Sequence, residues 1–81
     1  MDYGAKKYQR IRNLREDKDI TQKTIAAFLN ISQNTYSQYE TNVLEISIGT
    51  MAKLADFHNT SIDYLVERTD EPSPYPHKQN L

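Results

Sequence analysis

Apolar residues recur every three to four positions through most of the chain, which is the spacing that one face of an α-helix requires. Residues 5–66 contain a single glycine and no proline, a composition typical of helices joined by short turns. The pattern therefore predicts an all-α fold with five helices, which begin near Gly4, Thr21, Ser32, Ser47 and Thr60 and end near Asp17, Leu29, Glu40, His58 and Val66.

The apolar side of each predicted helix defines a candidate core. Ile20 and Ile31 fall in predicted turns, and we expect both to pack into the same core. The other expected core residues are Tyr8, Ile11, Leu14, Ile25, Ala26, Leu29, Tyr36, Ile48, Met51, Leu54, Ala55, Ile62, Leu65 and Val66.

Short polar residues stand where the predicted helices begin and end. A side-chain oxygen before the first turn can accept a hydrogen bond from an unpaired backbone N–H, which predicts N-caps at Thr21, Ser32 and Ser47. Thr60 and Asp63 fit a capping box for the fifth helix. Asparagine tolerates the left-handed conformation that often ends a helix, which fits Asn30, Asn42 and Asn59.

The composition changes after the fifth predicted helix. All three prolines of the chain lie between Pro72 and Pro76, within polar sequence. We therefore expect one compact domain over residues 1–67 and a flexible, polar, proline-containing tail over residues 68–81.

The second and third predicted helices, residues 21–29 and 32–40, are joined by only Asn30 and Ile31. Two helices joined so tightly cross steeply, which is helix-turn-helix geometry. In that geometry the second helix lies in the DNA major groove. Amide side chains can pair with adenine, although the same residue types also occur on ordinary solvated helix faces. The candidate base-reading residues are Gln33, Asn34, Ser37 and Gln38.

Several short motifs agree with one known family at the same spacing. They are I-x-x-L-R-E at 11–16, T-Q at 21–22, I-S at 31–32 and S-I-D-Y-L at 61–65. Over residues 11–66 the chain resembles the lambda-repressor-like, Cro/cI-type (XRE) helix-turn-helix domain. The resemblance implies a compact five-helix domain that binds double-stranded operator DNA, usually as a homodimer.

The resemblance also implies roles for individual residues. Gln22 would hydrogen-bond a DNA phosphate, and Asn42 would touch phosphate through its main chain. Gln33 and Asn34 would read base edges. Bases or the adjacent backbone would be contacted by Ser37 and Gln38.

Arg15 and Glu40 correspond to a partly buried salt bridge that joins the first and third helices in this family. We therefore interpret both as structural residues, because losing one would leave an uncompensated charge. The family often has glycine where this chain has Asp19, Asn30 and Asn42.

The charge distribution gives mixed indications. The net charge is −1, and the third predicted helix has no lysine or arginine, which argues mildly against nucleic acid. Six of the ten basic residues nevertheless lie in the first eighteen positions. Among them, Lys6 and Arg10 are candidate phosphate contacts, with a solvated helix face as the alternative.

Other chemistries have little sequence support. The chain has no cysteine, and its two histidines, His58 and His77, fit no metal-binding motif, so we expect no metal and no cofactor. The chain is short for a sizeable substrate cleft, so we expect neither an enzyme nor a small-molecule substrate. No apolar run is long enough to cross a membrane, which favours a cytoplasmic protein. The family resemblance implies a nucleoid-associated protein of bacterial or phage type.

The leading hypothesis is a sequence-specific transcriptional regulator, a repressor that binds a palindromic operator as a homodimer. Tyr64 in the fifth helix is our candidate for the dimer contact. The alternative is a protein-interaction module of the same fold, antitoxin-like or a co-regulator, with weak or partner-dependent DNA binding.

Overall fold

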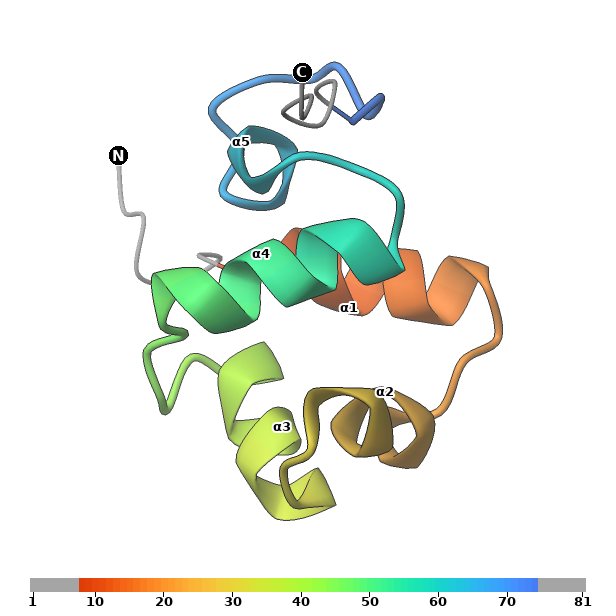
Figure 1. Ribbon diagram of the computed structural model, residues 1–81, viewed down its shortest axis with the longest axis vertical. Coiled ribbons are helices and arrows are strands. Elements are labelled where there is room, and N and C mark those ends of the chain that lie inside the picture. Colours follow the sequence, from red (N-terminus) through yellow and green to blue (C-terminus); the bar gives the residue numbers. More distant parts are fainter. Residues whose placement is uncertain (1–7, 75–81) are drawn as a thin grey trace, which may run out of the picture.

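The computed structural model describes residues 8–74, and within this range the chain forms five helices and no strand (Figure 1). The helices are α1 (Gln9–Asp17), α2 (Gln22–Leu29), α3 (Gln33–Glu40), α4 (Ile48–Phe57) and α5 (Ile62–Leu65). α1 and α4 cross the middle of the molecule, with α5 on one side and α2 and α3 on the other. The all-α prediction is confirmed, whereas the expected helix start near Gly4 lies outside the described residues.

The five helices enclose a single core. Its fully buried side chains are Tyr36, Ile11, Ile25, Leu54 and Leu65. The expectation for Ile48 was wrong: it is the first residue of α4, and its side chain is 74% exposed. The inward face of α4 starts only at Met51, and Ile46 in the preceding loop fills the position closer to the core.

Every helix ends in the same way, although no glycine is available for the purpose. The N–H groups of two consecutive residues fold back onto carbonyls of the last turn, as Asn30 and Ile31 do onto Ala27 and Ala26 at the end of α2. This arrangement is the Schellman motif, which places one residue in the left-handed region. Those residues are Asp19, Asn30, Asn42, Asn59 and Glu67, with φ between 54° and 64°.

The beginnings of the helices follow the predicted hydroxyl caps with one correction. The side chains of Thr21, Ser32 and Ser47 accept hydrogen bonds from backbone N–H groups, as predicted. The fifth helix is capped by Ser61, whose Oγ accepts from the Tyr64 N–H at 3.0 Å, and not by Thr60. The buried Thr60 hydroxyl instead donates to the Pro72 carbonyl at 2.7 Å.

Part of the segment after α5, which we expect to belong to a flexible tail, makes hydrogen bonds to the domain. The Arg10 guanidinium of α1 donates to the Thr69 carbonyl at 2.7 Å and pairs with the Asp70 carboxylate at 2.7 Å. The Thr60–Pro72 hydrogen bond attaches the same segment to the α4–α5 turn. The rest of the predicted tail, residues 75–81, lies outside the described residues.

Candidate nucleic-acid interface

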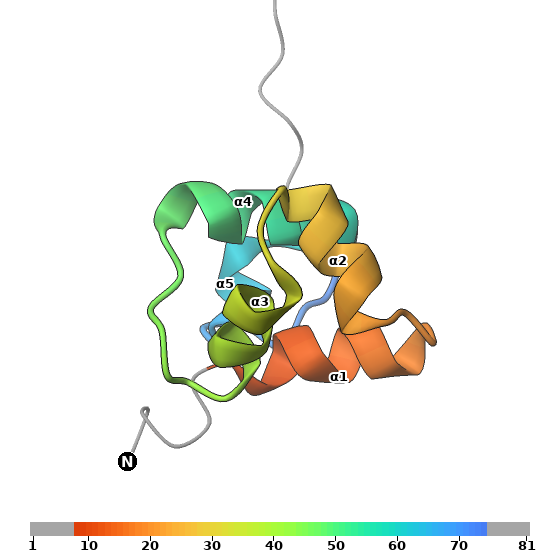
Figure 2. The ribbon, with the colours of Figure 1, turned by 90° about the horizontal axis from the view of Figure 1, so that it is seen from below.

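The two helices of the predicted helix-turn-helix lie together on the side of the molecule opposite α5, which Figure 2 views directly. Asn30 adopts the left-handed conformation with φ 59° and ψ 44°, which turns the chain sharply after α2. The Ile31 N–H donates to the Ala26 carbonyl at 3.0 Å, and the Ile31 side chain packs against the core. The turn therefore holds α3 in a fixed direction relative to α2.

α3 has one face in the core and another toward solvent. Tyr36 is completely buried, and the Tyr39 ring packs edge-on against it with 6.3 Å between ring centroids. Gln33 and Asn34, in the first turn, are exposed. Ser37 lies one turn further along and is half-buried, as is the adjacent Gln38. The predicted base-reading residues thus divide into two exposed amides and two partly covered side chains.

Both ends of α3 are closed by local hydrogen bonds. At the start, Ser32 Oγ accepts from the Thr35 N–H at 3.0 Å and donates to the Thr35 hydroxyl at 2.9 Å. At the other end, the Gln38 carbonyl accepts from the N–H groups of Val43 and Leu44 at 2.9 and 3.1 Å. These bonds leave the amide side chains of Gln33 and Asn34 exposed in the first turn of α3.

A buried ion pair connects α1, α2 and α3. Arg15 Nε donates to Glu40 Oε2 at 2.7 Å, and Arg15 Nη2 donates to Oε1 at 3.0 Å. The side chains are only 13% and 2% exposed. Gln22 Nε2, in the first turn of α2, donates to the same Oε1 at 3.0 Å. One carboxylate therefore positions both the salt-bridge partner and the residue expected to meet a phosphate.

The protonation of this cluster follows from its burial and its partners. Burial by itself would raise the pKa of the Glu40 carboxyl, but the hydrogen bonds from Arg15 and other neighbours outweigh it and lower that pKa. The same hydrogen bond raises the pKa of Arg15. Burial also raises the pKa of the neighbouring Tyr36 hydroxyl. The ion pair is therefore fully charged, and Tyr36 neutral, at neutral pH.

The remaining predicted phosphate contacts differ in their surroundings. The Asn42 N–H donates to the Tyr39 carbonyl at 3.2 Å, so its main chain already has a partner at the end of α3. The Arg10 guanidinium is engaged by the segment after α5 and lies 4.1 Å from the centroid of the Tyr64 ring. Lys6 lies outside the described residues. Of these residues, Gln22 lies at the end of α3, where its amide bonds to Glu40. Arg10 lies against α5 and the segment after it, away from α3.

Lys23 is a candidate that the sequence reasoning did not single out. It is the only lysine or arginine between residues 21 and 40. It lies in the first turn of α2, directly after Gln22, and is exposed. Its position beside a residue with an expected phosphate contact was the signal that could have identified it.

His58 is buried at the end of α4, and its surroundings do not resemble a metal site. Its side chain is neutral, because burial and then the nearby Lys18 ammonium lower its pKa to about 4. Lys18 Nζ lies 3.4 Å from His58 Nδ1 and donates to its carbonyl at 3.2 Å. Among residues 8–74 no cluster of three histidine, cysteine or acidic side chains is placed to hold a metal ion. In the same range no helix is both long and apolar enough to cross a membrane.

The steep α2–turn–α3 pair within a five-helix domain defines the class of this protein. The model of the helix-turn-helix family matches residues 11–65, which includes all of α2 and α3. The chain belongs to this family, in its Cro/cI-type (XRE) branch.

Three curated relatives illustrate the similarity. The uncharacterised HTH-type transcriptional regulator YobD of Bacillus subtilis (strain 168) is 30% identical over 90% of this chain and 65% of its own length. The HTH-type transcriptional regulator ImmR of the same organism is 34% identical over 76% of this chain and 49% of its own length. The cryptic phage CTXphi transcriptional repressor RstR of Vibrio cholerae is 33% identical over 75% of this chain and 55% of its own length. The chain thus spans between about half and two thirds of these relatives, and no solved structure matches it.

Proposed function

We propose that this protein is a sequence-specific DNA-binding transcriptional regulator, and specifically a repressor. The observation that carries the proposal is the first turn of α3, where the exposed amides of Gln33 and Asn34 project from a helix fixed by the turn at Asn30. The relatives support it, since ImmR is named a transcriptional regulator and RstR a transcriptional repressor. The proposal includes no catalytic step.

In this proposal α3 lies in the major groove and its first turn meets the base edges. An amide side chain offers a donor and an acceptor together, which matches the N6 and N7 edge of adenine. α3 contains no lysine or arginine, the residues that pair bidentately with guanine. We therefore expect the recognised site to have adenine–thymine pairs opposite Gln33 and Asn34.

The start of α2 supplies the phosphate contacts. Gln22 uses one N–H of its amide on Glu40, and the second N–H of that nitrogen is a donor for a phosphate oxygen. Lys23 beside it adds a positive charge. Contacts of this kind fix the register of α3 on the duplex and carry no sequence information of their own.

In this proposal the repressor binds as a homodimer to a palindromic operator. Each copy would place one α3 in the major groove, with the half-sites about 34 Å apart, one turn of DNA. Such a protein would act in the cytoplasm of a bacterium, on chromosomal or phage DNA.

Selection from a randomised duplex library at near-physiological salt tests this function. The expected result is a recurrent, two-fold-symmetric motif containing adenine–thymine pairs. A folded protein that enriches no motif would reject the proposal.

The second candidate is a protein-interaction module with weak or partner-dependent DNA binding. The net charge of −1 and an α3 without basic residues favour it. The salt dependence of affinity separates the two functions, because phosphate contacts release counterions and binding then weakens steeply as salt rises.

A further inference from the structure

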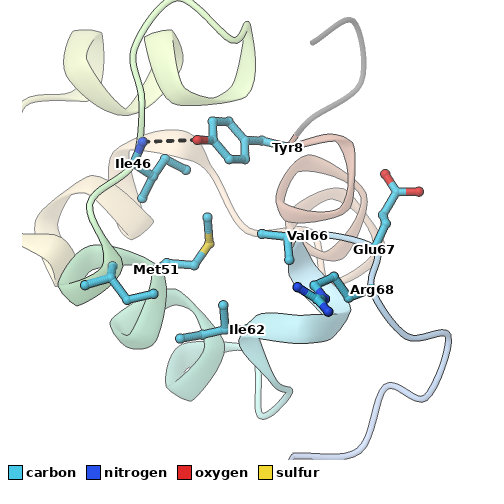
Figure 3. A pocket seen from close by; sticks show the side chains of 8 residues that line it. Tyr8, Ile46, Met51, Ile62, Val66, Glu67 and Arg68 are labelled. Atoms are coloured by element: carbon cyan, nitrogen blue, oxygen red, sulfur yellow. Dashed lines mark hydrogen bonds between the residues drawn. The ribbon is translucent and has the colours of Figure 1, made fainter. Parts of the chain in front are cut away.

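Within residues 8–74, α4 has an uncovered apolar surface near each of its ends. At its start, Ile48 and Met51 line an apolar groove of about 770 Å³, which Figure 3 shows from close by. At its end, Phe57 lies against Phe28 of α2, and the Phe28 side chain is 50% exposed. Exposed apolar surface of this kind is typical of an interaction site.

The apolar surface at the end of α4 consists of two aromatic rings, and we call it the Phe28–Phe57 surface. The ring centroids are 4.9 Å apart, with an interplanar angle of 54°. The Phe57 ring also packs edge-on against the buried ring of His58, with 5.1 Å between centroids, which anchors the pair in the domain. A further aromatic ring can pack on the exposed side of Phe28 at the spacing that aromatic side chains prefer.

The segment after α5 begins at the other surface, the groove. Residues 67–68 line the groove directly after α5 (Figure 3). Arg10 of α1 then donates to the Thr69 carbonyl and to the Asp70 carboxylate, both at 2.7 Å. The Glu71 N–H donates to the Thr69 hydroxyl at 3.2 Å. These hydrogen bonds give the segment a defined path as it leaves the groove.

The same segment reaches the other end of α4 by residue 74. The Pro72 carbonyl accepts a hydrogen bond from the Thr60 hydroxyl at 2.7 Å, in the turn between α4 and α5. Pro74 and Asp56 line one hollow of about 300 Å³. Asp56 directly precedes Phe57, the last residue of α4. The chain therefore arrives at residue 74 at the end of α4 that carries the aromatic pair.

The sequence that follows suits an aromatic surface. Tyr75 comes directly after Pro74, and Leu81 supplies a second apolar side chain. Pro76 follows Tyr75, and a proline restricts the residue before it to extended conformations. Less conformational entropy is therefore lost when Tyr75 packs against the domain.

We propose that residues 75–81 cover the Phe28–Phe57 surface of their own chain, with the Tyr75 ring packed on the two phenylalanine rings. The contact ties this segment to α2, one of the two helices of the helix-turn-helix, so a ligand of residues 75–81 has to displace them from α2. The inference is independent of the proposed function, since it involves no DNA. It differs from the flexible tail that composition predicts over residues 68–81, and two measurements separate the alternatives.

Urea denaturation of the full chain tests the contact through a double-mutant cycle. Tyr75→Ser is expected to lower the folding equilibrium constant about two- to tenfold, the range for one aromatic ring packed on another. Phe28→Ser should lower this constant too. The double variant should then lose less than the product of the two separate factors, because both substitutions remove the same contact.

Val43→Ser is the matched control for the cycle. Val43 is 66% exposed, lies in the loop between α3 and α4 and belongs to neither apolar surface. Its effect should multiply with that of Tyr75→Ser. A Tyr75→Ser chain as stable as the wild type would overturn the proposal, and so would independent effects of Tyr75→Ser and Phe28→Ser.

Nuclear Overhauser effects in the wild-type chain test the contact without any substitution. Cross-peaks are expected between the Tyr75 ring and the ring of Phe28 or Phe57. Their absence would overturn the proposal, and cross-peaks from Tyr75 to Met51 would assign the segment to the groove instead. A mixture of isotope-labelled and unlabelled chains distinguishes copies: cross-peaks found only between different copies would reject a contact within one chain.

Discussion

The Arg15 guanidinium and the Glu40 carboxylate meet through two hydrogen bonds, of 2.7 and 3.0 Å, which join α1 to the end of α3. Gln22 donates to the same carboxylate from the start of α2. A single buried side chain thus fixes the placement of α1 relative to α2 and α3, the two helices of the candidate DNA interface. We therefore expect Glu40 to influence both the stability of the domain and its contact with DNA.

Removing the charge of Glu40 should destabilise the protein strongly. Glu40→Gln leaves the nearly buried Arg15 without a counter-charge, and we expect the free energy of unfolding to fall by about 3 kcal/mol or more. Glu16→Gln is the control, because the Arg12–Glu16 pair is half-exposed and should contribute about 0.5 kcal/mol or less. Urea denaturation measures both, and equal losses would contradict the structural role of the buried pair.

The same cluster should affect DNA binding separately from stability. In Arg15→Met/Glu40→Leu an apolar pair replaces the ion pair, so stability should return to near the wild-type value. Gln22 then lacks its partner, and operator affinity should fall about as far as in Gln22→Ala, by about 1 kcal/mol. The loss should be uniform across sequences, as for a phosphate contact. Fluorescence anisotropy titrations measure this loss. An unchanged affinity would show that Gln22 does not contact the DNA.

Glycine at the end of α1 should stabilise the domain. Asp19 is exposed and has φ 55°, a conformation that costs energy for a residue with a Cβ. Asp19→Gly should raise the unfolding free energy by about 0.5–1 kcal/mol. The control, Asp17→Gly, places glycine inside the last turn of α1 and should lower it by a similar amount. Thermal unfolding of the two variants should therefore shift in opposite directions.

His58 should make stability depend on pH. Its pKa is lowered from 6.5 to about 4, so the unfolded chain binds a proton at a higher pH than the folded chain does. The stabilisation is complete above pH 6.5 and is lost as the pH falls toward about 4.

The expected loss between about pH 7 and pH 5 is about 2 kcal/mol in the wild type. Glutamine does not titrate, so the free energy of unfolding of His58→Gln should change much less over the same pH range. A wild type with the same pH dependence as the variant would show that folding does not lower the pKa of His58.

The helices and the helix-turn-helix could be predicted because their signals are local. Hydroxyl caps at Thr21 and Ser32 and the asparagine at position 30 fix the ends of α2 and the start of α3 within a few residues. Apolar spacing then identifies the buried side of each helix. The Arg15–Glu40 pair came from the family resemblance, since nothing local connects residues so far apart in sequence.

The features that sequence missed depend on tertiary contacts. Ile48 fits the helical repeat of α4, but whether a first-turn residue is buried depends on what lies opposite it. Ser61 caps α5 because the helix begins at Ile62, and the Thr60 hydroxyl bonds to the Pro72 carbonyl instead. Arg10 resembled a phosphate contact because its partners, Thr69 and Asp70, lie at the other end of the domain. Periodicity carries no information about such pairings.

The most direct test of the central claim is a base-by-base affinity profile for Gln33→Ala on the selected operator. Every single-base variant of one half-site is titrated with the wild type, with Gln33→Ala and with Gln9→Ala, an exposed α1 glutamine as control. The account predicts that Gln33→Ala loses about 1–3 kcal/mol of discrimination at one base position, while Gln9→Ala keeps the wild-type profile. A Gln33→Ala profile identical to that of the wild type would contradict the assignment of α3 as the base-reading helix.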